Sequence, residues 1–193
     1  MSKITIDIAK DENGNRTFRD FVTIEDARIV TEYNNFSGCH GFREDDTRKS
    51  VCVVIDDPDA IQFFEQSGWN LKTNTYTQTG EEIRYLQVRV SYRFYNPNDR
   101  NPVPTIVEKD PTSGKLTHYD EETVSAIDSF RRKDGFEHCD IVFKGSPYEG
   151  QNGSGVTGYL QWMQFIPRYN AYEDTIERLS YADEEQQDAN MPF

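Results

Sequence analysis

The apolar residues of this chain fall in short runs that alternate with polar residues or end soon in Gly, Pro or Asn. Val51–Ile55 is a continuous apolar run of strand length, and Arg84–Tyr95 alternates apolar with polar side chains. Asn96–Pro104 and Gly145–Gly155 have the Pro or Gly content of loops. Runs this short predict many short strands, arranged as a small, partly open barrel rather than a doubly wound fold.

Two short helices interrupt the strands. Asp57 and Pro58 suit the start of the first, because Asp accepts hydrogen bonds from free N–H groups and Pro lacks one. Gly68 ends it. The second begins at Asp120 and runs to about Lys133, with acids at its start and bases at its end. The predicted class is therefore mainly β with two short helices.

The charge is strongly negative, at −13, with a sequence pI of about 4.6. From Glu173 onward seven acids face one base, so these 21 residues carry −6; the remaining 27 acids and 20 bases give −7. Nucleic-acid phosphates require Lys and Arg. Any such site must therefore be a local basic strip on an acidic body.

Three cysteines make an odd number without framework spacing, which indicates reduced thiols. The beginning of the chain has no apolar run typical of a signal peptide, and no stretch approaches the roughly 20 apolar residues of a membrane span. We expect a soluble protein of the cytoplasm.

The strand predicted at Arg84–Tyr95 has two unlike faces, because side chains alternate along a strand. Leu86, Val88 and Val90 form a core face. The other face carries two guanidiniums, which can meet phosphates, and two tyrosines, which can stack on any base. The first predicted DNA contacts are Tyr85, Arg89, Arg93 and Tyr95. An ordinary solvated strand face with exposed tyrosines is the alternative.

Further candidates for DNA contact come from loops and from the segment after the first helix. Trp69 is the second aromatic candidate, although Trp is buried more often than exposed and a core position is the alternative. Loop side chains at a barrel mouth often line an oligonucleotide groove. The remaining candidates of this kind are Lys72, Phe36, Arg43, Arg48, Lys49, Lys144 and Tyr148.

The end of the chain is acidic and polar until its last three residues, a composition that cannot bury enough surface to fold. A terminal Phe offers a ring and a carboxylate together, which suits a partner pocket with an apolar floor and a basic rim. A solvated tail that only keeps the protein soluble is the alternative. The residues predicted to bind a partner are Asp183, Glu184, Glu185, Asp188, Met191, Pro192 and Phe193.

This ending resembles the C-terminal tails of bacterial and phage single-stranded-DNA-binding proteins, in which the tip docks on replication and repair partners. The body is similar to phage proteins of the same kind in the order of Asn35–Gly38, Val51–Asp56, Gly68–Lys72 and Tyr85–Tyr92. This likeness spans about residues 28–166. It implies an OB-like (oligonucleotide/oligosaccharide-binding) five-stranded antiparallel barrel with added strands.

We therefore expect an OB-like domain over residues 1–172 and a disordered acidic tail over residues 173–193. The predicted function is non-enzymatic: the protein binds and protects single-stranded DNA with little sequence preference during phage replication or recombination. The tail would recruit partner proteins, and a homo-oligomer is possible. Two alternatives are a metal-dependent nuclease and a protein-interaction or virion component that binds no nucleic acid.

Recognisable catalytic and cofactor motifs are absent from the sequence. Cys39-His40 and His138-Cys139 lack the spacing of a zinc site, and the paired acids Asp45-Asp46, Asp56-Asp57 and Glu121-Glu122 suit loops and helix starts. No phosphate-binding GxxxxGK[ST] and no GxSxG is present. We expect no cofactor and no bound metal.

Overall fold

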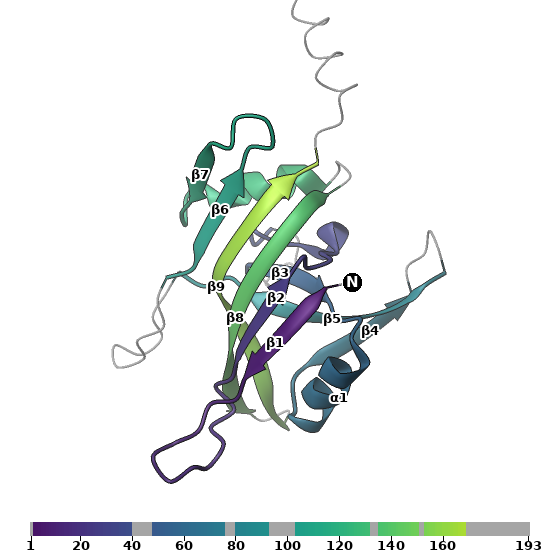
Figure 1. Ribbon diagram of the computed structural model, residues 1–193, viewed down its shortest axis with the longest axis vertical. Coiled ribbons are helices and arrows are strands. Elements are labelled where there is room, and N and C mark those ends of the chain that lie inside the picture. Colours follow the sequence, from purple (N-terminus) through teal and green to yellow (C-terminus); the bar gives the residue numbers. More distant parts are fainter. Residues whose placement is uncertain are drawn as a thin grey trace, which may run out of the picture.

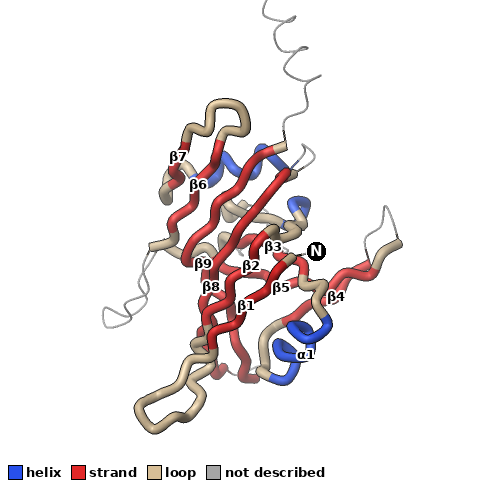
Figure 2. The backbone as a smooth tube through the Cα atoms, in the orientation of Figure 1, coloured by secondary structure: helices blue, strands red, loops and turns tan. Residues whose placement is uncertain are grey.

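The computed structural model describes residues 2–39, 48–75, 80–92, 103–131, 135–150 and 153–168. It is built mainly from strands, as Figure 2 shows. The nine strands found in these ranges are β1 (Lys3–Asp7), β2 (Phe21–Glu25), β3 (Ser50–Val54), β4 (Leu71–Thr75), β5 (Glu82–Arg89), β6 (Thr105–Lys109), β7 (Leu116–Tyr119), β8 (Phe136–Gly150) and β9 (Gly153–Pro167). The helices are α1 (Pro58–Gln66) and two 3₁₀ segments, η1 (Thr31–Tyr33) and η2 (Val124–Arg131).

All nine strands belong to one hydrogen-bonded sheet with the central order β1-β2-β8-β9-β5-β3 (Figure 1). The long β8–β9 hairpin forms its middle. β4 pairs with β5, and the β6–β7 hairpin joins the other side through parallel pairing of β6 with β9. Within the described residues, no pairing connects β3 back to β1. The mainly β, OB-like class is confirmed, and its sheet is curved but open.

The core lies on one face of this sheet. Val22, Phe143 and Leu160 pack there from β2, β8 and β9, and Val88 and Val51 continue the layer on β5 and β3; each of these side chains is 0–2% exposed. Strand pairing joins Val22 to Phe143, Phe143 to Leu160, and Val51 to Val88. Because side chains alternate along a strand, the residues next to these in sequence lie on the opposite face.

The helix α1 forms where the sequence predicts it. The Asp57 carboxylate accepts a hydrogen bond from the Ala60 N–H at 2.8 Å, Pro58 occupies the first turn, and Gly68 follows with a φ of +72°. Phe64 turns into the core. The helix leads directly into Trp69, whose backbone forms a parallel bridge to Val156 on β9.

Two segments differ in structure from the sequence-based expectation. Arg28–Phe36, expected as a strand, contains η1 and only isolated bridges, because the buried Asn34 side chain takes the Cys52 N–H at 2.9 Å in place of a ladder partner. The regular strand is the preceding β2. Most of Gly145–Gly155, expected as a loop, continues the β8–β9 hairpin.

Within the described ranges, no helix is both long and apolar enough to span a membrane.

Candidate nucleic-acid interface

The two faces of β5 are divided as its alternation predicts. Leu86, Val88 and Val90 are at most 4% exposed and belong to the core. Gln87 and Arg89 lie on the opposite face, outside the core, together with Tyr85. The core-face prediction for this strand is confirmed.

Strand register extends this polar face across the sheet. Phe21 on β2 is paired with Lys144 on β8, Lys144 with Tyr159 on β9, and Tyr159 with Arg89 on β5. Paired residues of neighbouring strands share a face. These four side chains therefore form one line across four strands, in which aromatic and basic groups alternate. We call Phe21, Lys144, Tyr159 and Arg89 the aromatic–basic row.

Each cation of the row lies over an aromatic ring. The Lys144 Nζ is 5.3 Å from the centre of the Phe21 ring, and the Arg89 guanidinium carbon is 6.0 Å from that of Tyr159. Such contacts are worth about 0.5–1 kcal/mol at exposed sites. The Arg89 Nη1 also approaches the Tyr159 hydroxyl oxygen at 3.5 Å, the outer limit of a hydrogen bond. These contacts orient the cations of the row against its rings.

Several other basic side chains form ion pairs with carboxylates. Lys3 pairs with Glu25 at 2.6 Å, and Arg28 pairs with Glu81 at 2.9 Å. Arg84 pairs with Glu65 at 3.0 Å. By contrast, no carboxylate among the described residues forms an ion pair with Arg89 or Lys72. The positive charges of Arg89 and Lys72 are therefore available to an external anion, although the chain has 34 acids.

A small hollow of about 160 Å³ opens beside the Arg89 end of the row. We call it the polar hollow; its polar lining includes Arg48, Ser50, Lys72, Gln87, Arg89 and Thr157. It lies where β5 changes neighbours, from β9 at Arg89 to β4 at Leu86. None of the described residues that line it is acidic.

The predicted contact residues of β5 are only partly within the described chain. Tyr85 is on the polar face but packs against Tyr33, with ring centres 5.8 Å apart, in a small satellite cluster. Burial there raises the pKa of its hydroxyl, with smaller contributions from Cys52 and Tyr33. Arg93 and Tyr95 lie outside the described residues.

Phe36 and Trp69 are core residues. Phe36 is fully buried, and Trp69 is 5% exposed with edge contacts to Phe64 and Phe143 at 5.1 and 5.8 Å. The indole fits because Gly145 and Gly158, paired across the hairpin, have no side chains beneath it. This burial removes both aromatic side chains from the candidate site.

The predicted loop bases divide into two groups. Arg48 and Lys72 line the polar hollow, and Lys144 belongs to the row. Lys49 instead turns toward the start of η2, where its Nζ donates to the Glu121 carbonyl at 3.1 Å and lies 5.9 Å from the Tyr92 ring centre.

Tyr148 and the remaining predictions lie farther away. Tyr148 is 45% exposed near the tip of the hairpin, opposite Gly155. Arg43 and all seven predicted tail residues (Asp183, Glu184, Glu185, Asp188, Met191, Pro192 and Phe193) fall outside the described part of the chain.

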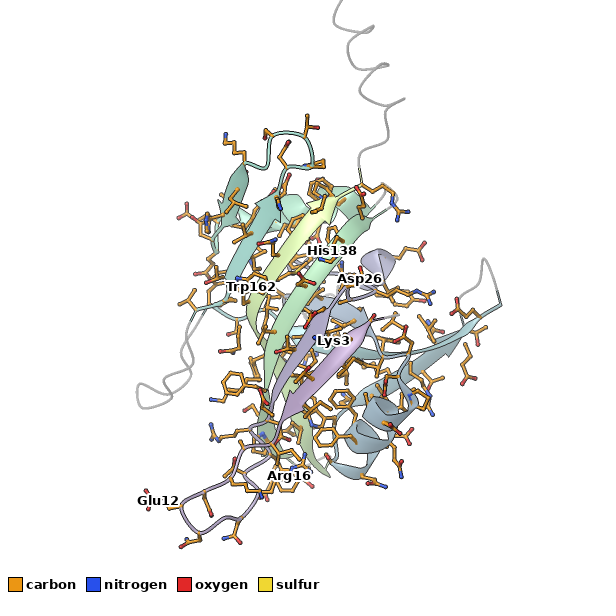
Figure 3. The ribbon with its side chains drawn as sticks, in the orientation of Figure 1. Lys3, Glu12, Arg16, Asp26, His138 and Trp162 are labelled. Atoms are coloured by element: carbon orange, nitrogen blue, oxygen red, sulfur yellow. The ribbon has the colours of Figure 1, made fainter. Side chains whose placement is uncertain are left out.

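Three aromatic residues of this face were not predicted: Phe21, Tyr159 and Trp162. Trp162 follows Tyr159 on β9 beyond a bulge, pairs with Val142 and Thr105, and is partly exposed; Figure 3 labels it on this strand. The available signal was alternation in Val156–Phe165, where Val156, Gly158 and Leu160 are buried and Thr157 and Tyr159 are not. That pattern places Tyr159 outward, but only strand register brings it to Arg89.

His138, near the start of β8, contacts two carboxylates; Figure 3 labels it close to one of them, Asp26. Its Nδ1 lies 3.1 Å from the Asp26 Oδ1, and its Nε2 lies 3.1 Å from the Asp140 Oδ1. Desolvation lowers the pKa of His138, but hydrogen bonds and charges from Asp140 and Asp26 together outweigh it, so the pKa stands above its usual value. No group of three or more His, Cys, Asp or Glu suited to a metal occurs in the described ranges.

One protein-family model matches residues 14–192, and its description is "Putative phage ssDNA-binding domain". The match covers nearly the whole chain, the aromatic–basic row included. No curated protein matches the chain.

Three solved structures of phage proteins are similar at low levels. The single-stranded DNA-binding protein from bacteriophage Enc34 is 11% identical with a TM-score of 0.46, covering 86% of this chain and 92% of that one. The same protein in complex with ssDNA is 11% identical with a TM-score of 0.43, and the match covers 86% of this chain and 97% of that one. The protein gp2.5, a single-stranded DNA binding protein encoded by bacteriophage T7, is 12% identical with a TM-score of 0.31. That match covers 89% of this chain and 96% of that one. Likeness this weak transfers no residue's role.

Proposed function

The chain belongs to the phage single-stranded-DNA-binding domain family, and from this premise we propose that it binds single-stranded DNA through the aromatic–basic row. We propose that it binds with little sequence preference and protects the single strand during phage replication or recombination. Such a role belongs in the cytoplasm of the host bacterium.

The observation that supports this site most directly is the alternation of ring and cation across four strands. Stacking on Phe21 and Tyr159 suits unpaired bases, because each base has a π-face whatever its identity. Lys144 lies between the two rings in the row, and Arg89 lies beside Tyr159. Both cations can contact the phosphates that link stacked bases. Duplex DNA offers phosphates but hides its base faces, so a face of this composition favours single strands.

The first experiment is a titration of a fluorescent oligothymidylate with the full chain, in the presence of EDTA, beside a matched duplex. We expect tighter binding of the single strand and an affinity that falls steeply between about 50 mM and about 200 mM salt. Equal affinity for duplex, or no binding at the lower salt, would contradict the proposal. Degradation of the oligonucleotide that requires magnesium would favour a nuclease instead.

The site is tested by neutralising its two cations together, as Arg89→Gln with Lys144→Gln. Each single-strand phosphate contact contributes about 0.7 to the logarithmic salt slope, so the double variant is expected to lower the slope by about 1.4. The matched control is Lys109→Gln with Lys115→Gln, two exposed lysines on the β6–β7 hairpin, which should keep the slope. An unchanged slope in the Arg89/Lys144 variant would remove the row from the site.

The stacking role is tested at Tyr159. Loss of a base–aromatic stack costs about 1–3 kcal/mol, so Tyr159→Ala should weaken binding by about 5-fold to 150-fold, while Tyr159→Phe should retain affinity. The pair separates stacking from the contact of the hydroxyl with Arg89. A Phe variant as weak as the Ala variant would mean that the hydroxyl, and not the ring, is what matters.

The acidic end of the chain completes the proposal. Residues 173–193 are proposed to be a solvated tail whose last residues, Met191–Phe193, recruit replication or recombination proteins, while residues 1–172 bind DNA. Deleting Met191–Phe193 should leave affinity for oligothymidylate unchanged and abolish capture of host or phage replication proteins. Partner capture that survives the deletion would refute this part alone.

A further inference from the structure

The polar hollow has a structural origin in the way β5 is paired. In addition to β3, β5 pairs with β9 at Arg89 and with β4 from Leu86 back to Glu82. Just before β4 begins, Trp69 forms an isolated parallel bridge to Val156 on β9. The two neighbours separate around Gln87, and the hollow of about 160 Å³ opens between them.

The lining of the hollow is one-sided in charge. Arg48, Lys72 and Arg89 contribute three positive groups, and no described lining residue contributes a negative one. A concentration of positive charge in a concave surface focuses the field and raises the local concentration of anions. The lining of the hollow is therefore positive in a protein whose net charge is −13.

The side chains of the hollow are also held in place. The Lys72 Nζ donates to the Gln87 Oε1 at 2.6 Å, and the Gln87 Nε2 donates to the Ser50 Oγ at 3.0 Å. An ammonium has three donors and a hydroxyl has one, so this chain of contacts leaves donors, and few acceptors, facing the space. What it can receive is a compact group rich in acceptor oxygens.

We propose that the polar hollow is a binding site for a single phosphate group, held by Lys72 and Arg89 with Arg48 at its rim. This inference rests on the proposed function, since the phosphate is that of the bound DNA. The size agrees with a group of a few atoms, because pockets for whole small molecules measure about 300–1,000 Å³. The phosphate is either an internal diester of the strand or a terminal monoester at its end.

The central test compares Lys72→Gln with wild type in the oligothymidylate titration at several salt concentrations. Loss of one phosphate contact should lower the logarithmic salt slope by about 0.7. Lys72→Arg should restore the slope. Lys115→Gln, at an exposed site on the β6–β7 hairpin, should not change it. Thermal unfolding of each variant shows whether the protein remains folded.

A second measurement uses inorganic phosphate alone and needs no DNA. Nuclear magnetic resonance of the Arg and Lys side-chain nitrogens should show saturable shifts at Arg89 and Lys72 as phosphate is added, and none at Lys115. Arg89→Gln should abolish the response at Lys72. Shifts spread evenly over all surface bases would overturn the proposal, since they report a non-specific ion atmosphere.

The source of the phosphate is read from short oligothymidylates with and without a terminal phosphate. If a monoester occupies the hollow, adding a 5′ or 3′ phosphate should strengthen binding several-fold in wild type but not in Lys72→Gln. If an internal diester occupies it, the terminal phosphate should have no effect, and Lys72→Gln should weaken both oligonucleotides alike.

Failure of this inference and failure of the proposed function give different results. Wild type that binds oligothymidylate tightly, with an unchanged slope in Lys72→Gln and no response to phosphate, would overturn the hollow and leave the function standing. A localised response to phosphate in a protein that binds no single strand would overturn the proposed function and retain an anion site.

Discussion

Single residues decide how closely the middle of the sheet can pack. Gly145 is the sharpest example: a Cβ at this position would lie 2.7 Å from the Phe18 carbonyl oxygen and 2.9 Å from the Trp69 Cζ2. Phe18 itself has a φ of 57°, an uncommon backbone conformation for a bulky residue. The close approach of the segment around Phe18, the indole and the hairpin depends on the missing side chain.

We therefore expect Gly145→Ala to lower the free energy of unfolding by about 1–3 kcal/mol, the usual cost of overpacking. Gly150→Ala is the matched control on the same strand, because its nearest neighbour would be 3.9 Å away. Urea denaturation of both variants measures the difference. Equal stability would show that Phe18 and Trp69 can shift at little cost.

His138 makes one part of the sheet sensitive to pH. Its pKa is raised in the folded protein, so its contacts with Asp26 and Asp140 stabilise the fold fully below the usual His value of 6.5, and this contribution is lost as pH rises through the raised value. The urea midpoint of wild type should therefore exceed that of His138→Gln by more at about pH 5.5 than at about pH 8.5. His118→Gln, on the exposed surface of β7, should show no such difference. A gap that is constant with pH would argue against the charged contact.

At the scale of elements, β3, α1 and β5 could be predicted because their local patterns are strong. Val51–Val54 is continuous in apolar residues, Asp57 and Pro58 define a helix start, and Leu86 alternates with Tyr85 and Gln87. The candidate site was predictable only to the same extent. Arg89 follows from alternation within one strand. The pairing of Tyr159 with Arg89, and of Phe21 with Lys144, follows from register between strands, which local patterns do not encode.

The irregular segment before β3 was not predictable for a related reason: its supports are distant in sequence. The Asp128 carboxylate of η2 accepts the backbone N–H groups of Phe36 and Ser37 at 2.9 and 2.8 Å, across more than 90 residues. These contacts hold the segment against the core in place of a strand ladder.

Asp128→Ala should consequently destabilise the protein by about 1–3 kcal/mol, because two partly buried N–H groups lose their acceptor. Ser129→Ala changes the exposed neighbouring residue and should have little effect. Hydrogen exchange of the Phe36 and Ser37 amides offers a local readout beside the denaturation midpoint. Protection that persists in Asp128→Ala would mean that another acceptor replaces the carboxylate.

For the whole molecule, the proposed DNA site joins four strands, so occupancy and global stability are linked. A ligand that binds only the folded state stabilises it by about 2.7 kcal/mol at a concentration 100 times its dissociation constant. We expect oligothymidylate, and not duplex, to raise the melting temperature accordingly. The Arg89→Gln and Lys144→Gln double variant should show a smaller shift at equal DNA concentration. A shift of equal size in both proteins would indicate that DNA binds elsewhere.

The aromatic–basic row also has a consequence for the protein during its own synthesis. Its members come from β2, β5, β8 and β9, and the last of them, Tyr159, is separated from Phe21 by most of the chain. Chains emerge from the ribosome with the N-terminus first. A nascent chain thus carries no assembled row until β9 has left the exit tunnel. The messenger being translated, itself a single strand, therefore meets the complete proposed binding face only after β9 has emerged.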